Sequence, residues 1–338
     1  MHKFYKLLFF LSTLISTLIS ISSNSWLISW IGLEINLLSI MPLMKLSNNK
    51  FSSETMIKYF IIQSLSSMLL LFTILTSMNS FFFFMYNSQM IFYMMSISLL
   101  MKMGAAPFHF WFPEVMSNLK WNIFYLILTW QKISPFILLS YLNYKIEFLV
   151  IFIILSAFTG SILGLNMLCI RKLLSYSSIN HISWMLISLL NYKIWLFYFL
   201  TYSIMNFFII IYLMKFNIYY MNQSNFMLNN NYMNLLFSLN LLSLGGLPPF
   251  IGFFPKWITI NLLINNNLFY LSILMIMSTL INLFFYIRLI IPLMLLNNSF
   301  FSSMKFNKMN MNLYFIILMN LTFLFSLMIY TILFLIIT

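Results

Sequence analysis

Apolar runs of about bilayer length alternate with short polar connectors along the chain. A helix needs ~20 residues to cross the hydrocarbon core of a membrane, so the pattern predicts eleven membrane helices. They are expected at residues 4–22, 26–45, 55–78, 89–112, 121–142, 147–168, 172–190, 194–215, 232–264, 268–295 and 312–337. No connector is long enough to form a soluble domain. We therefore expect an all-α, polytopic protein with a single membrane domain over residues 1–338.

The distribution of cations supports this helix count. With the N-terminus inside and successive helices alternating in direction, the inner ends and loops hold Lys3, Lys6, Lys45, Lys50, Lys58, Lys120, Arg171, Lys172, Lys215, Lys305 and Lys308. The outer ends hold Lys145 and Lys193. Inner loops of membrane proteins carry such an excess of positive charge, so the N-terminus is predicted to face inward. The basic start resembles a signal peptide, but no small-residue cleavage site follows, and we expect a retained first helix.

Prolines interrupt two predicted helices near their midpoints. Gly104 precedes Pro107 in the fourth helix, and Gly245 precedes Pro248 in the ninth, by three residues in each case. Proline removes a backbone donor and clashes with the preceding turn, so both helices are expected to break. Each break has a lysine nearby. The pattern predicts two inverted repeats with broken helices, as in transporters. The expected boundaries are 1–142 for the first five-helix repeat, 147–295 for the inverted second repeat and 312–337 for a C-terminal transmembrane helix.

Composition narrows the possible functions. The chain is 62% hydrophobic and 6% charged, with a mean hydropathy of +0.97. Its one cysteine, Cys169, excludes disulfides within the chain and cysteine-ligated iron–sulfur clusters, and three histidines are too few for two haems. No glycine-rich phosphate loop is present, and we expect no cofactor on this chain. The net charge of +13 is attributed to lysines that flank membrane helices, so nucleic acid is not an expected partner. Scarce glycine and abundant methionine and phenylalanine are typical of an AT-rich genome, such as a mitochondrial one.

Four ionisable residues stand within long apolar runs: Glu34, Lys102, Lys132 and Lys256. A charged side chain inside a bilayer costs roughly 2.5 kcal/mol or more, and such residues commonly mark a proton or ion pathway. Lys132 lies near the middle of its helix, which Pro135 is expected to bend. The expected partner of Glu34 is Lys102. The structural alternatives are a lysine reaching for the interface at Lys102, a lysine orienting a half-helix at Lys256, and a neutral packing acid at Glu34.

The other polar residues give weaker signals. His181 lies well inside the seventh predicted helix, where it either relays protons or hydrogen-bonds a neighbouring hydroxyl group. Glu54 and Lys58 are four residues apart at a helix start, a spacing that predicts an ion pair at the membrane interface. Glu114 and Glu147 are expected to be loop charges.

Seven runs of the sequence resemble one family closely. They are SNSWLISWIGLEINLLSIMPLM, KYFIIQS, MKMGAAPFHFWFPEV, LTWQKISPF, IRKLLSYSSINHISWM, LLSLGGLPPFIGFFPKW and FYIRLI, and they cover the chain from about residue 20 to residue 290. Together they are similar to the mitochondrial NADH dehydrogenase (ubiquinone) subunit 2 family, the antiporter-like, proton-pumping subunits of respiratory complex I. The AT-rich composition resembles that of insect members.

The resemblance implies eleven helices and a set of proton-path residues. In that set Glu34 pairs with Lys102, Lys132 connects the two halves of the chain, Lys256 lies on the exit side, and His181 lies on the central polar axis. The family's role is to move protons from the mitochondrial matrix to the intermembrane space.

The resemblance also implies a location and partners. The chain would span the mitochondrial inner membrane many times, with its N-terminus on the matrix side. It would contact neighbouring antiporter-like subunits, other membrane-arm subunits and lipids. NADH oxidation and ubiquinone reduction would occur on other subunits, so the chain would belong to an enzyme without holding a redox site. Two alternatives stay open: a stand-alone or Mrp-type cation/proton antiporter, and a structural membrane-arm subunit that conducts nothing.

Overall fold

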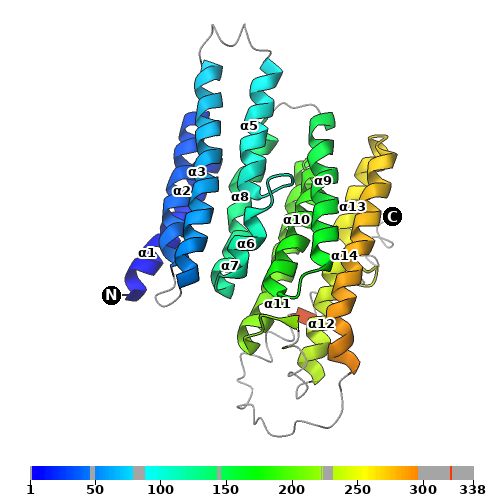
Figure 1. Cartoon of the computed structure of the whole chain (residues 1–338). Helices are drawn as coiled ribbons and strands as arrows, with labels where there is room; N and C mark the ends of the chain where they lie inside the picture. Colours follow the sequence, from blue (N-terminus) through cyan, green and yellow to red (C-terminus); the bar gives the residue numbers. More distant parts are fainter. Residues whose placement is uncertain are drawn as a thin grey trace. The chain divides into compact units, whose positions relative to one another are not determined.

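Helices account for nearly all of the described structure. The structure, a computed structural model, describes residues 2–45, 50–78, 88–142, 146–221, 223, 231–295 and 320–321. Within these residues the chain forms helices, turns and one isolated β-bridge between Cys169 and Tyr220 (Figure 1). The all-α prediction is confirmed for this part of the chain. The helix predicted at 312–337 lies outside the described residues, except at 320–321.

The chain divides into two compact units, Met1–Ser156 and Ala157–Thr338. The boundary between them lies inside α9 (Ile146–Leu165). The first unit contains α1 (His2–Ser22), α2 (Trp26–Met44), α3 (Lys50–Met78), α5 (Ser88–Met103), α6 (Trp111–Ser117), α7 (Trp121–Leu128) and α8 (Trp130–Ser140). In this unit α3 packs against α2, α5 and α6, and α8 packs against α1, α5 and α7. These two helices therefore connect the others.

The helix predicted at 121–142 is two helices in the structure. The backbone turns between α7 and α8 at Thr129, with φ of −116° and ψ of −72°. The Thr129 hydroxyl donates to the Tyr125 carbonyl at 2.8 Å, a type of bond that bends helices. Pro135 stands inside α8 and lacks the N–H that would continue the helical hydrogen bonds. The backbone is therefore disturbed on both sides of Lys132, and not only after it.

The second unit is built around a buried polar helix. It contains the rest of α9 together with α10 (Ile170–Ser188), α11 (Tyr192–Phe216), α12 (Asn231–Gly245), α13 (Phe253–Asn265) and α14 (Phe269–Leu295). α10 packs against α11, α13 and α14, and nearly all of its residues are buried. Its sequence includes five serines, Asn180 and His181. The polar side chains of α10 are therefore enclosed by the other helices of this unit.

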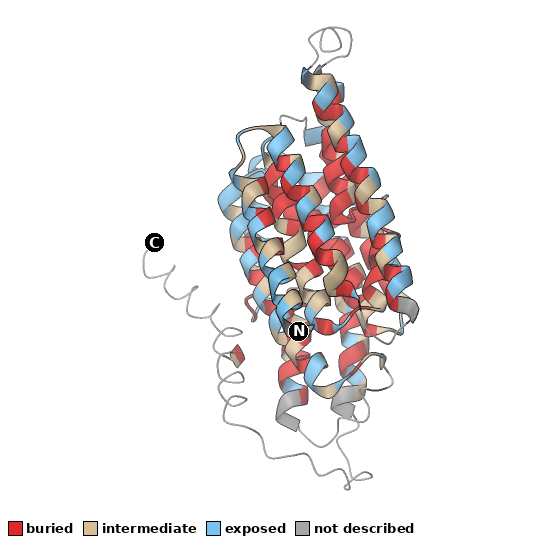
Figure 2. Cartoon of the chain, turned by 90° about the vertical axis from the view of Figure 1, so that its left-hand side faces the viewer, coloured by how far each residue is buried: buried red, intermediate tan, exposed pale blue. Residues whose placement is uncertain are grey.

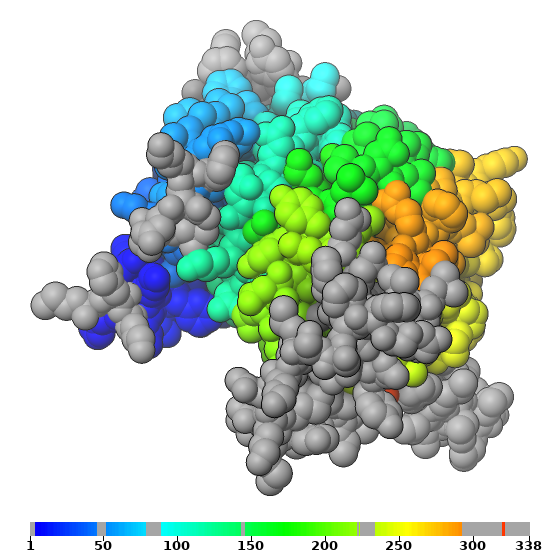
Figure 3. Space-filling view, turned by 60° about the horizontal axis from the view of Figure 1, so that its bottom comes forward, coloured from blue at the N-terminus to red at the C-terminus, as the bar shows by residue number. Residues whose placement is uncertain are grey.

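The outer faces of the helices are apolar. Phe72 is 65% exposed, and the outward sides of the helices are coloured as exposed while the red, buried residues face inward (Figure 2). α1, dark blue at the edge of the first unit in Figure 3, exposes Leu7 and Leu18. Large exposed apolar surfaces mark contact with lipid or with other proteins. Seven of the described helical segments are long and apolar enough to cross a membrane, and the polar α10 is not among them. These features fit a multi-pass membrane protein.

Many buried serine and threonine hydroxyls are bonded within their own helices. Ser66, Ser98 and Ser178 each donate to the carbonyl three residues earlier at 2.7 Å. Such bonds satisfy hydroxyl groups that have no water partner inside a bilayer. The abundance of buried serine therefore does not by itself make a polar channel.

Both predicted breaks are present, and they end in the same backbone motif. α5 stops before Gly104 (φ 76°), and α12 stops before Gly246 (φ 84°). In each case the glycine N–H bonds to the carbonyl three residues earlier, and the next N–H bonds to the carbonyl five residues earlier. This pattern is the Schellman motif, which needs a left-handed residue. Gly246, three residues before Pro249, is therefore the glycine that corresponds to Gly104. The predicted correspondence with Gly245, three residues before Pro248, is wrong by one residue.

Candidate functional site

Lys102 and Lys132 line the same cavity in the first unit. Lys102 is in the last turn of α5 and is 9% exposed, and Lys132 is in the first turn of α8 and is 1% exposed. The cavity has a volume of about 20 Å³, and the ring centre of Phe112 lies 5.4 Å from the Lys132 Nζ. A polar cavity of this volume holds about one water molecule. Two lysines predicted separately from the sequence thus meet at one water-sized space.

Three side-chain amides surround this lysine cavity. Gln63, on α3, donates to the backbone carbonyl of Lys102 at 3.2 Å. That carbonyl belongs to the last turn of α5 and has no helical donor because the helix ends there. Gln131, next to Lys132, donates to the Oδ1 atom of Asn36 at 2.9 Å. All three amides line the cavity, so neutral polar groups and lysines share its wall.

Glu34 lies near this site but does not line the cavity. It is half-buried on α2. Between these two described side chains there is no direct ion pair. Leu33 and Asn36, its neighbours on α2, do line the cavity. The predicted partnership of Glu34 and Lys102 is therefore not a direct ion pair in this conformation, and direct contact requires one of the side chains or helices to move.

Lys256 caps the broken helix of the second unit. It lies in the first turn of α13 and is 6% exposed, and its Nζ donates to the carbonyls of Leu244 at 3.1 Å and Gly245 at 2.9 Å. These carbonyls end α12, where the helix dipole favours a cation. When the two glycine breaks are aligned, the Leu244 carbonyl corresponds to that of Lys102, which Gln63 caps. At corresponding helix ends, the terminal carbonyl is therefore capped by the Lys256 ammonium group in the second unit and by the Gln63 amide group in the first unit.

Gly246 lies directly against the Lys256 side chain. A Cβ at this position would be 2.8 Å from the lysine Nζ and Cδ, at a backbone φ of 84°. We expect Gly246→Ala to destabilise the second unit by about 1–2 kcal/mol from backbone strain, and to displace Lys256 from the helix end. The control is Gly245→Ala, whose Cβ would make only ordinary contacts at 3.5 Å or more. The fraction of assembled chain that survives heating in membranes should fall for Gly246→Ala alone, and equal losses would contradict this expectation.

His181 has a hydroxyl partner within the second unit. Its Nδ1 lies 2.9 Å from the Tyr198 hydroxyl, and both residues are buried. The next residue back, Asn180, donates to the Ala157 carbonyl at 3.1 Å and to the Ser278 hydroxyl at 3.3 Å. The hydrogen bond to a hydroxyl is therefore present at His181. Because a tyrosine hydroxyl both donates and accepts, this contact is also compatible with a proton relay.

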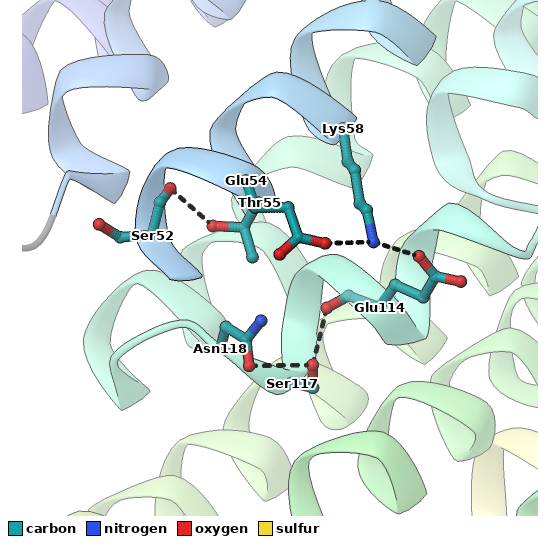
Figure 4. A network of polar contacts seen from close by, with 7 residues as sticks. All are labelled: Ser52, Glu54, Thr55, Lys58, Glu114, Ser117 and Asn118. Carbon is teal, nitrogen blue, oxygen red and sulfur yellow. Dashed lines mark hydrogen bonds and ion pairs between the residues drawn. The ribbon is translucent and has the colours of Figure 1, made fainter. Parts of the chain in front are cut away.

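An ion network lies on the surface of the first unit. Lys58 pairs with Glu54 at 2.8 Å, as predicted, and also with Glu114 at 2.9 Å (Figure 4). The expectation that Glu114 and Glu147 are loop charges is wrong, because they stand in the first turns of α6 and α9. Carboxylates are favoured at helix starts by the helix dipole. Glu114 therefore belongs to the half-helix that follows the first break.

Sequence reasoning missed Asn36, Gln63, Gln131 and Tyr198. Each is a neutral polar residue in an apolar run, and such residues cost far less in a membrane helix than a charge, so they give a weak signal. Only Gln131 gives a usable sequence signal, because it directly precedes the buried Lys132.

Comparison with known proteins shows the family. A family model described as "NADH:quinone oxidoreductase/Mrp antiporter, TM" matches residues 23–282. The NADH-ubiquinone oxidoreductase chain 2 of Anopheles gambiae is 46% identical over 320 residues, which cover 91% of this chain and 92% of that relative. The chain belongs to the NADH-ubiquinone oxidoreductase chain 2 family. Membership of the chain 2 family confirms the resemblance carried by the seven sequence runs.

The chain 2 family fold is shared with other membrane complexes. A chain of respiratory complex I from Thermus thermophilus matches with a TM-score of 0.83 at 21% identity, covering 96% of this chain and 78% of that chain. A chain of the Mrp complex from Dietzia sp. DQ12-45-1b matches with a TM-score of 0.71 at 12% identity, covering 83% of this chain and 59% of that chain. At these identities the likeness establishes the fold alone, so the activity must be argued from the site.

Proposed function

We propose that this chain translocates protons in the membrane arm of an NADH:ubiquinone oxidoreductase in the mitochondrial inner membrane. The observation that carries the proposal is the pair of buried lysines, Lys102 and Lys132, around one cavity of about 20 Å³. An amine can hold or release a proton, and one water can pass a proton between two amines. The relatives' name, NADH-ubiquinone oxidoreductase chain 2, supports a coupling to quinone reduction.

Glu34 would control the proton on Lys102. Removing a lysine from water disfavours its charged form, so the charged and neutral forms become comparable in free energy. At an effective dielectric constant of about 20, opposite unit charges 4 Å apart attract by roughly 4 kcal/mol. Movement of Glu34 toward Lys102 would therefore load a proton there, and movement away would release the proton toward Lys132.

In the second unit, Lys256 would deliver the proton to the intermembrane space. The carbonyls of Leu244 and Gly245 stabilise its ammonium form, so release of the proton requires this cap to loosen. His181, which is hydrogen-bonded to Tyr198, would relay protons among the buried polar side chains of the same unit. The broken helix thus links the protonation of Lys256 to the backbone around it.

We also propose the eleven-helix arrangement with inverted repeats over 1–142 and 147–295, and a final helix at 312–337. The Schellman motifs at Gly104 and Gly246 support the repeat, because each ends a helix three residues before a proline, at Pro107 and Pro249. The excess of lysine and arginine at the inner ends supports a matrix-side N-terminus.

The proposed partners follow from membership of the membrane arm. They are neighbouring antiporter-like subunits, other membrane-arm subunits, and lipids against the apolar outer faces of the helices. NADH oxidation and ubiquinone reduction are assigned to other subunits, since one cysteine cannot ligate an iron–sulfur cluster. The chain is thus proposed as part of an enzyme, with no redox site or cofactor of its own.

A stand-alone or Mrp-type cation/proton antiporter is the second candidate. It is suggested by the TM-score of 0.71 to a chain of an Mrp complex. The 46% identity to a chain 2 relative, against 12% to the Mrp chain, favours the first candidate. Purification separates the two, because a complex I subunit is recovered with NADH:ubiquinone activity and a stand-alone antiporter is not. A non-conducting structural subunit would be recovered with that activity too, and is tested by the substitutions that follow.

Replacing Glu34 with glutamine keeps the size of the side chain and removes its charge. We expect proton pumping and coupled quinone reduction to slow by about five-fold or more, the size of a typical coupling between two sites. Assembly and NADH oxidation with an artificial electron acceptor should stay normal. The control is Glu147→Gln, an exposed carboxylate in the first turn of α9. A Glu34→Gln complex that pumps as fast as the Glu147→Gln complex would make Glu34 a packing acid.

A further inference from the structure

The half-helix α6 has few local interactions that fix its position. It contains seven residues and follows the first break, and its N-cap residue, Phe110, makes no side-chain hydrogen bond to the free N–H groups of the first turn. A helix this short is not stable on its own. The position of α6 therefore depends on its contacts with other helices, and α3 is one of the helices against which it packs.

Two consecutive residues of α3 contact α6. The Lys58 Nζ lies 2.9 Å from a carboxylate oxygen of Glu114, and the Tyr59 ring meets the Trp111 ring edge-on with centroids 5.9 Å apart. Figure 4 shows Lys58 between Glu114 and Glu54, the second carboxylate being 2.8 Å away on the same helix as Lys58. The ion pair of Lys58 with Glu114 thus joins α3 to α6, whereas its ion pair with Glu54 lies within α3.

Other residues of α6 form part of the wall of the lysine cavity. Trp111 and Phe112 both line the space shared by Lys102 and Lys132. The Phe112 side chain is buried, and its ring centre is 5.4 Å from the Lys132 Nζ. A shift of α6 along α3 would therefore change the wall of the cavity at the point where it meets Lys132.

We propose that Lys58 and Glu114 are positioning residues for proton transfer at Lys132. Their ion pair holds α6 on α3, and α6 in turn holds Phe112 against Lys132. Neither Lys58 nor Glu114 lines the cavity, so they act through the wall and not on the proton itself. This inference rests on the proposed proton transfer, and it adds a surface contact that sets the geometry of that step.

The two carboxylates around Lys58 provide a matched comparison. Glu54 and Glu114 contact the same nitrogen, and their side chains are both 56% exposed. We expect Glu114→Gln to lower the maximal rate of coupled quinone reduction by about two- to five-fold, the range over which an exposed ion pair shifts an equilibrium. Glu54→Gln should leave the rate unchanged. In both variants the amount of assembled complex, the KM for ubiquinone and NADH oxidation with an artificial acceptor should match the wild type.

A reversed ion pair tests whether the tether itself matters. On the Glu54→Gln background, which avoids two neighbouring glutamates, Lys58→Glu should repeat the loss of rate. Adding Glu114→Lys should restore the rate, because the pair between α3 and α6 is formed again with opposite signs. If the Glu114→Gln complex does not assemble, the variant with the reversed pair provides the test, because the proposal requires that variant to assemble and to reduce quinone at the restored rate. Equal rates for Glu54→Gln and Glu114→Gln, or no recovery with the reversed pair, would overturn the proposal.

Lys132→Met, measured in the same membranes, separates this inference from the function on which it rests. If Lys132→Met pumps normally, the proposed proton transfer is wrong, whatever Glu114→Gln does. If Lys132→Met stops pumping while Glu114→Gln behaves like Glu54→Gln, only the positioning role is wrong.

Discussion

Replacing Lys132 with methionine is expected to stop proton transfer in the first unit while the chain still assembles. Lys132 is 1% exposed and lines the cavity that it shares with Lys102. Methionine fills a similar volume but cannot bind a proton. Removal of a proton-transfer group commonly lowers a rate by 10²-fold or more, so we expect coupled quinone reduction to fall by about a hundred-fold. The rate is measured in inner membranes with NADH and a ubiquinone analogue.

The control for this substitution is Lys120→Met. Lys120 belongs to the same unit but is exposed, at the start of α7. Its replacement removes the same charge from the chain and leaves the lysine cavity untouched. We expect the Lys120→Met complex to keep the wild-type rate. Equal rates for Lys120→Met and Lys132→Met, with equal amounts of complex, would take Lys132 off the proton path.

Arginine and methionine at Lys256 are expected to separate two roles of this residue. Arginine stays protonated in proteins, so Lys256→Arg can still donate to the carbonyls of Leu244 and Gly245 but cannot release a proton. Methionine loses both capacities. Both variants should lose coupled quinone reduction by about a hundred-fold. Only Lys256→Met should also lower the stability of the assembled chain, by about 1–3 kcal/mol, because it leaves buried carbonyls without donors.

The two roles are read by different measurements. Quinone reduction reports proton release, and the fraction of chain left in the complex after heating reports the helix cap. A Lys256→Arg complex that pumps at the wild-type rate would show that Lys256 acts only as a cap. A Lys256→Met complex as heat-resistant as the wild type would show that the cap contributes little to stability.

Helix positions were the most predictable part of the fold. The predicted helix at 26–45 corresponds to α2, Trp26–Met44, because a membrane helix needs a continuous apolar run. The breaks were predictable from glycine and proline, because these residues change the backbone directly. The turn at Thr129 was not, since threonine back-bonding leaves the hydropathy of the run unchanged.

The candidate site was predictable in its charged residues and not in their contacts. A lysine inside an apolar run is conspicuous because a charge there is costly. The contacts depend on which helices are neighbours, and one sequence does not specify this. The partnership of Glu34 with Lys102 is predicted from their isolation in apolar runs, but the shared cavity of Lys102 and Lys132 becomes apparent only in the structure. Lys256 begins α13 in the sequence, and only the intervening turn brings its amine to the end of α12.

The number of protons translocated per electron in membranes carrying Lys132→Met tests proton transfer through this chain most directly. The external pH change and quinone reduction are recorded together, at matched amounts of complex, with Lys120→Met in parallel. If protons pass through Lys132, the Lys132→Met membranes should translocate fewer protons per electron, or should translocate none and reduce quinone only at the background rate. The Lys120→Met membranes should keep the wild-type ratio. An assembled Lys132→Met complex that moves the wild-type number of protons per electron at the wild-type rate would contradict proton transfer through Lys132, and would make the chain a structural subunit of the membrane arm.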